Sequence, residues 1–190
     1  MGIHTEIYRE RDLRPDNWDK YSIKLFKGKK EVELSNPVSV RELFYFGKSV
    51  WAINEWFYQR EIKECKKYGF KPDEDLSYEC MFDQIIYLDD LKELLKDVKK
   101  ALANPERAKE IMPMPKKLKL RKPVEGTYED HGDSYSITAD TKWENVPRDE
   151  MYNEYYFESL RRAEELLEQL VREDEENKTN LYYDYILDIG

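Results

Sequence analysis

The sequence predicts an α+β fold, in which a small antiparallel sheet packs against three main helices and a long charged insertion precedes the last helix. Three observations predict it. Short strand-like segments come first, helical apolar spacing follows in three later stretches, and residues 114–147 show neither period. The chain has 190 residues, of which 14% are aromatic, so it is long enough to bury one core rich in large rings. We therefore expect a single domain over residues 1–190, with 114–147 as an insertion or loop.

The first strands are expected near the start of the chain. Residues 3–9 are β-compatible, and residues 21–26 are joined to 31–34 through a turn that contains Gly28. Polar and apolar residues alternate over 31–34, which leaves one face wet and the other free to pack on helices.

A long helix is expected over residues 39–67. Ser39 and Glu42 form a capping box after Pro37, and apolar residues then recur at three- and four-residue spacing. Gly47 inside this helix costs roughly 1 kcal/mol relative to Ala, which predicts close packing of the backbone there. The apolar residues are Leu43, Phe46, Val50, Ile53 and Phe57.

Three further elements follow. Leucines from Leu88 to Leu102 lie on one face of a predicted helix, and Asn104 starts a short helix that stops by Pro113. The last helix is predicted over residues 148–173, and residues 181–187 are expected to return as an edge strand.

The insertion carries a basic block. Its charged residues alternate with leucines, which suits a strand with one charged face, and residues 117–121 could pair with 135–139 in a β-hairpin. The block is either a solvated edge strand protected by lysine or a surface for binding a partner. Its candidate partner-binding residues are Lys116, Lys117, Lys119, Arg121 and Lys122.

Overall charge narrows the classes of partner. A net charge of −9 argues against direct nucleic-acid binding and against an anionic membrane. Acidic stretches at residues 130–158 and 164–176 leave an acidic nucleic-acid mimic as a lesser alternative. With only Cys65 and Cys80, no signal region and no apolar run of transmembrane length, we expect a cytoplasmic protein.

No set of residues in the sequence matches a known catalytic motif. Neither a nucleophile with an oriented base nor a phosphate-binding loop can be identified, and His4 and His131 are too far apart to give a zinc-ligand spacing. We expect no catalytic residue, no metal and no cofactor, which favours a role other than catalysis.

Two aromatic clusters remain to be explained, at residues 48–57 and 151–160, one in each of two predicted helices. Their residues either fill the core or form a small-ligand site, in which rings stack on a nucleotide base and amides bond to it. The candidate ligand-binding residues are Trp51, Asn54, Tyr152, Asn153, Glu154 and Tyr156.

The two clusters also carry a family resemblance. Residues 1–8, 48–57, 104–113, 151–160 and 181–183 resemble, in order and spacing, an uncharacterised family of tailed-bacteriophage and prophage accessory proteins. That family has an MGxDxYL start, a KxNxIHxWF helix and a TEYDExYLEDL helix. This chain departs from the pattern at His4, Trp51, Asn54 and Asn153, where the family has Asp, Asn, His and Asp.

The resemblance implies a phage protein that is dispensable for virion assembly and acts in the infected cytoplasm. Combined with the acidic composition and the charged insertion, it predicts a non-catalytic binder that interferes with a host protein in anti-defence or host takeover. A protein that binds or sequesters a small nucleotide, or acts on it as an enzyme, is the alternative. A homo-oligomer is left open.

Overall fold

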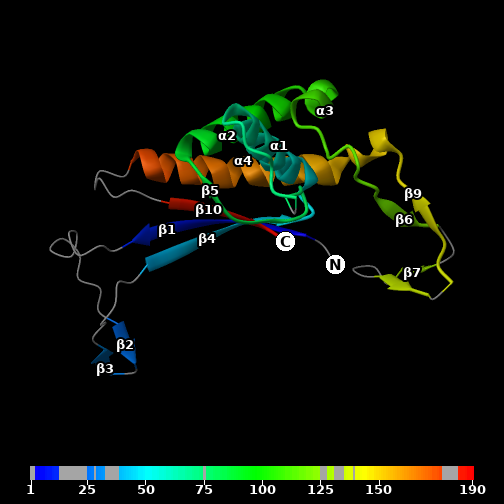
Figure 1. The fold of residues 1–190 in the computed structure, drawn as a ribbon. Helices are drawn as coiled ribbons and strands as arrows, with labels where there is room; N and C mark the ends of the chain where they lie inside the picture. Colours follow the sequence, from blue (N-terminus) through cyan, green and yellow to red (C-terminus); the bar gives the residue numbers. More distant parts are fainter. Residues whose placement is uncertain are drawn as a thin grey trace.

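The predicted α+β class is confirmed by a computed structural model, in which helices cover one face of a four-stranded antiparallel sheet (Figure 1). The structure describes residues 3–12, 25–27, 29–32, 39–74, 76–124, 128–130, 135–138, 140–176 and 184–190.

The main sheet has the strand order β4-β1-β10-β5, with every pair antiparallel. The predicted first strand is confirmed as β1 (His4–Asp12). The edge strand predicted over residues 181–187 is corrected: β10 (Asp184–Ile189) is central, because it pairs with β1 on one side and with β5 (Met81–Ile86) on the other, and residues 181–183 lie outside the described part of the chain.

The helix predicted over residues 39–67 is wrong in its first part. Residues 39–48 form strand β4 (Ser39–Lys48), which pairs with β1, and the helix α1 begins only afterwards (Trp51–Lys67). Gly47 has φ of +134° and Ser49 has φ of +55°, so the chain cannot be helical where it passes from strand to helix. Phe44 and Phe46 are buried on the side of β4 that faces the helices.

The other predicted helices are confirmed. α2 (Leu88–Ala103) is followed by a 3₁₀ turn, η2 (Pro105–Arg107), and by the short α3 (Ala108–Ile111). The last helix is split, since the 3₁₀ turn η3 (Arg148–Met151) precedes α4 (Glu154–Glu175).

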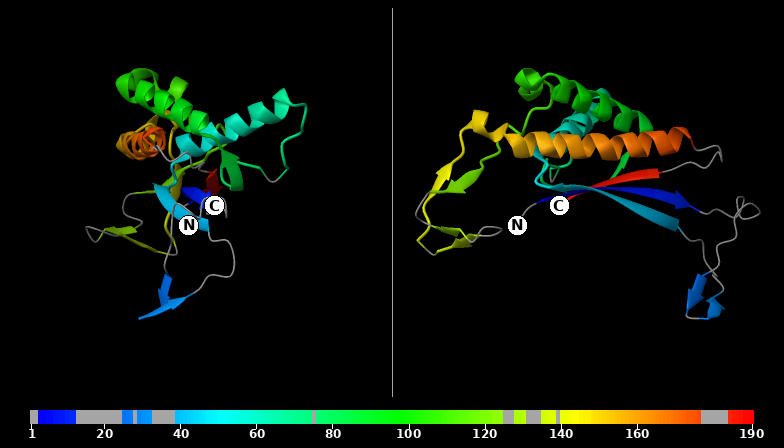
Figure 2. Two further views of the ribbon diagram at one scale, coloured as in Figure 1. Left: turned by 90° about the vertical axis from the view of Figure 1, so that its left-hand side faces the viewer. Right: turned by 180° about the vertical axis from the view of Figure 1, so that it is seen from behind.

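Helices α2 and α4 lie side by side and antiparallel (Figure 2). Lys92 pairs with Glu175 at 2.8 Å near one end of the seam, and Lys99 pairs with Glu168 at 2.6 Å further along it. Both pairs are exposed, so the buried leucines between the helices supply most of the stability. They are Leu91, Leu94, Leu160, Leu167 and Leu170.

The core lies between the sheet and the helices. The central strands contribute Ile7 and Leu187, and α1 contributes Ile53 and Phe57, all without exposed surface. Helices lie on this side of the sheet only, and Figures 1 and 2 show its other side free of described helices.

Shorter strand pairs lie away from the main sheet. β2 (Leu25–Lys27) pairs with β3 (Lys30–Val32), which confirms that part of the predicted hairpin; residues 21–24 and 33–34 lie outside the described part of the chain.

Within the insertion, β6 (Arg121–Pro123) pairs with β9 (Trp143–Asn145), and β7 (Tyr128–Asp130) pairs with β8 (Tyr135–Ile137). Figure 1 shows them as an arm beyond the start of α4. The expected pairing of residues 117–121 with 135–139 is wrong, because Leu118 is buried in the core and follows a turn at Pro115.

Candidate functional site

The first aromatic cluster lies on α1 and is tied to its surroundings. Trp51 is half-buried, and its ring meets Tyr78 edge-on with centroids 6.2 Å apart. Asn54 is fully buried, and its Oδ1 accepts a hydrogen bond of 2.6 Å from Thr5 Oγ1 on β1. Asn54 therefore joins helix to sheet.

The second cluster opens α4. The Tyr156 hydroxyl donates to the carbonyl of Met112 at 2.8 Å, and burial raises the pKa of that hydroxyl. Asn153 caps the helix, since its Oδ1 accepts from the Tyr156 N–H at 3.3 Å. The Tyr152 ring lies 5.0 Å from that of Tyr156, and Glu154 pairs with Arg161 at 2.7 Å.

Among the described residues, no hydrogen bond or ring contact joins the first cluster to these four residues of the second. The structure brings Tyr152, Asn153 and Tyr156 together as parts of one helix start. The shared nucleotide site remains a prediction.

A cleft of about 360 Å³ lies between α1, α2 and α3. Its most buried charged residue is Glu55, which is 8% exposed and accepts a hydrogen bond of 2.8 Å from Gln59. Burial raises the pKa of Glu55, and the nearby cations Arg148 and Lys116 oppose that rise. Five acidic and two basic side chains line the cleft, a balance that disfavours a phosphate ligand.

Glu55 is not among the site residues predicted from the sequence. Helical spacing gives no signal for it, because the residue two positions after Ile53 lies on the opposite side of the helix from the stripe of Ile53 and Phe57.

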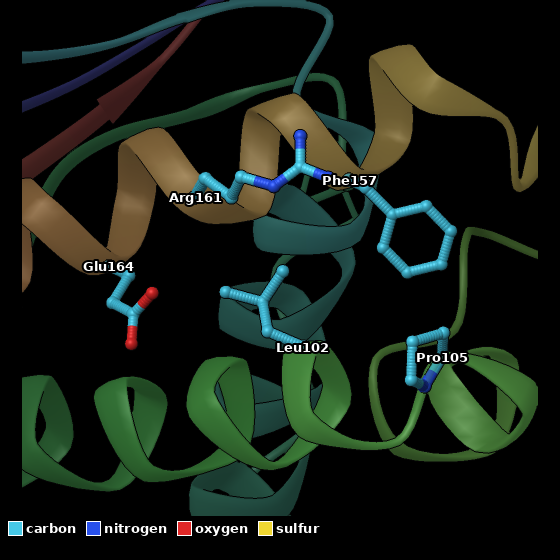
Figure 3. A pocket seen from close by; sticks show the side chains of 5 residues that line it. All are labelled: Leu102, Pro105, Phe157, Arg161 and Glu164. Carbon is cyan, nitrogen blue, oxygen red and sulfur yellow. The ribbon is translucent and has the colours of Figure 1, made fainter.

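A second hollow, of about 490 Å³, lies on the seam between α2 and α4. Figure 3 shows Leu102 and Pro105 facing Phe157 across it, with Arg161 and Glu164 along α4. Its charged groups have opposite signs, and Arg161 is already paired with Glu154. The hollow therefore presents no group that selects a ligand.

The basic block lies on the surface at the base of the arm. Its five cations are exposed while Leu118 is buried, so charged and apolar residues face opposite ways. Lys122 is held by Glu144 at 3.3 Å and by Glu150 at 3.4 Å. The charge of this residue is therefore partly balanced within the protein.

Clusters of metal ligands are absent from the described ranges. There, no group of three or more His, Cys, Asp or Glu side chains could hold a metal ion. None of the helices in that part of the chain is both long and apolar enough to cross a bilayer.

The open face of the sheet, which described helices do not cover, carries an apolar row. Tyr8 lies opposite Leu43 on one side and Ile186 on the other, and Ile186 lies opposite Ile85. Residues directly opposite in antiparallel strands project to the same face, so these four side chains form one row across the sheet. Leu43 is 51% exposed and Ile85 61% exposed at its two ends.

Carboxylates flank this row on the two central strands. Glu6 lies opposite Asp188, and Glu10 lies opposite Asp184. The Tyr8 hydroxyl donates to Glu6 at 2.8 Å, and Asp188 accepts from the backbone N–H of Asp83 at 2.8 Å. The apolar row thus lies between two pairs of like charges.

Aromatic residues border the open face near the start of β1 and the end of β10. The His4 and Tyr45 rings lie 5.7 Å apart, and the exposed Phe82 ring lies against Gly190. A Cβ at Gly190 would lie 2.5 Å from the Phe82 ring, so glycine permits this contact. The open face therefore combines exposed rings, an apolar row and paired carboxylates.

No family model, curated protein or solved structure matches this chain.

Proposed function

We propose that this chain is a phage accessory protein that binds a host protein without catalysis, in the cytoplasm of the infected cell, and that the open face of its sheet is the docking surface. The observation that supports this function is the apolar row of Leu43, Tyr8, Ile186 and Ile85. Antiparallel sheets commonly leave one face in water, but that face is then polar, so an apolar row on it favours a binding role.

The charges on this face favour a basic partner. The protein carries a net charge of −9, and the carboxylates beside the apolar row would draw a positively charged surface into register. We therefore propose that a basic patch surrounding an apolar centre on the host protein covers the face.

The size of the face bears on the strength of binding. Four strands at about 4.8 Å spacing and six residues at about 3.4 Å rise give roughly 400 Å². This area includes the carboxylates beside the apolar row, and a stable interface buries about 800 Å² per partner, which is more than the whole face offers. We therefore expect the partner to contact the arm of β6 to β9 as well.

The test is binding to the host protein before and after the face is altered. A tagged protein would capture candidates from host lysate, and the dominant one would be purified for titration. The double substitution Leu43→Ser and Ile85→Ser should weaken binding at least tenfold. Phe70→Ser is the control, because Phe70 is also an exposed apolar residue, at 70%, but it follows α1 and belongs neither to the main sheet nor to the arm.

A second variant tests the arm. Removing residues 121–145 spares the buried Met114 and Leu118, which a longer deletion would take from the core. This deletion should weaken binding less than the double substitution. Undiminished binding by the double variant, or equal loss in the Phe70→Ser control, would refute the docking face.

A further inference from the structure

We propose that the open face recognises one Lys or Arg side chain of the partner, held between Glu6 and Asp188, beside an apolar side chain that lies on Tyr8 and Ile186. This inference rests on the proposed function and specifies the chemistry of the partner.

The cation site follows from the register of the central strands. Glu6 and Asp188 are directly opposite, so their Cβ atoms are about 4.5–5.5 Å apart, and one ammonium or guanidinium group can contact both carboxylates. Like charges in opposite positions destabilise a sheet. A bound cation would remove that repulsion, which makes the pair a favourable place for a partner's charge.

The neighbours of this pair leave it acidic. On β4 the row continues to Tyr45, whereas on β5 the register shifts at this point and the backbone N–H of Asp83 binds Asp188. Arg162 approaches the row only at its β4 end, where its guanidinium lies 5.5 Å from the centroid of the Tyr45 ring. The row therefore ends in an aromatic ring on β4 and in a backbone N–H on β5.

The second acidic pair differs. Glu10 lies opposite Arg41 on β4 as well as opposite Asp184 on β10, so a cationic residue already belongs to that row. The pair of Glu6 and Asp188 is thus the better site for an external cation.

The spacing defines the segment that would bind. Tyr8 and Ile186 lie two residues from the pair on their strands, which is about 7 Å along the sheet. In an extended segment, side chains at alternate positions have the same separation and direction. A Lys-x-Leu or Arg-x-Leu segment lying along the strands therefore matches both rows.

The probe is a capped peptide of sequence Gly-Thr-Lys-Thr-Leu-Thr-Gly, titrated into the whole protein labelled with ¹⁵N and followed by amide chemical shifts. The reference peptide has Glu in place of Lys. We expect the Lys peptide to shift amides of β1 and β10, and the Glu peptide to leave them in place.

Matched variants test the charge. Glu6→Gln with Asp188→Asn should reduce the shifts at least threefold while keeping amide oxygens for the Tyr8 and Asp83 bonds. Glu106→Gln with Glu165→Gln removes the same charge at exposed positions on other elements and should leave the shifts unchanged. Loss of shifts in the Glu106/Glu165 variant as well would show attraction by net charge alone and overturn the inference.

The two proposals can fail separately. If the Lys peptide shifts no amide of β1 or β10, the cation site is refuted, whatever the host titration gives. If the peptide binds as expected but Leu43→Ser with Ile85→Ser leaves host binding intact, the cation site stands and the proposed docking function does not.

Discussion

Thr5 Oγ1 on the central strand donates a hydrogen bond of 2.6 Å to Asn54 Oδ1 on α1, and neither residue has exposed surface. Thr5→Val removes the hydroxyl and leaves a buried amide without that partner, so we expect a loss of about 1–3 kcal/mol in the free energy of unfolding. Urea denaturation measures it. Adding Asn54→Leu should recover part of the loss, and a further loss of the full size would show that the two groups are independent.

Gly47 sits where β4 turns toward α1. Its φ of +134° lies outside the left-handed helical region, whereas Gly69 has φ of +76° and open space where a Cβ would lie. Gly69→Ala should cost about 1 kcal/mol, and Gly47→Ala should cost more, because its backbone must also shift. Thermal unfolding of the two variants compares them; equal melting temperatures would contradict the assignment of strain to Gly47.

Glu55 makes stability depend on pH. Burial raises the pKa of Glu55 in the folded protein. As the pH rises, Glu55 therefore ionises in the unfolded chain before it ionises in the folded protein. Between these two pKa values the free energy of unfolding falls with pH. Glu55→Gln should therefore be more stable than the wild type at neutral pH, and the difference should vanish below the ordinary glutamate pKa of about 4.3. Unfolding at several pH values checks this sign. A difference that stays constant with pH would point to packing instead.

Glu6 carries a stability cost in the free protein. Glu6→Gln relieves the repulsion across the sheet from Asp188 and should raise stability by a few tenths of a kcal/mol, the scale of cross-strand pairs. The gain should shrink in 1 M salt, where charges are screened within about 3 Å. Glu106→Gln, on an exposed turn, should change the free energy of unfolding little. Urea midpoints of both variants at two salt concentrations would distinguish relief of the Glu6–Asp188 repulsion from a general effect of removing one charge.

Elements with one clear period could be predicted from the sequence. The apolar residues of α2 recur on one face, and Leu91, Leu94 and Val98 are indeed buried against the core. In β4, by contrast, Phe44 and Phe46 follow a period of two within a segment that also has helical spacing and a capping box. Pairing with β1 decides in favour of a strand over a helix, and the local sequence pattern does not show that this pairing occurs.

The remaining strands show why the candidate site was missed. β5 carries a register shift near Phe82 and Asp83, so its burial does not alternate and its sequence lacks a strand signature. The docking face depends on β1 lying next to β10, two segments from opposite ends of the sequence. Alternation along β1 indicates a wet face with Glu6 on it, but not that Asp188 lies opposite.

The central position of β10 has a consequence for synthesis on the ribosome. β1, β4, α1 and β5 all emerge before residues 184–189, yet β1 and β5 join the same sheet only through β10. Until that strand is made, one side of β1 is an unpaired edge, and a late, long-range contact must close the sheet. The nascent chain therefore exposes one side of β1 and one side of β5 that can bind chaperones or aggregate, and β10 pairs with both of these sides at once.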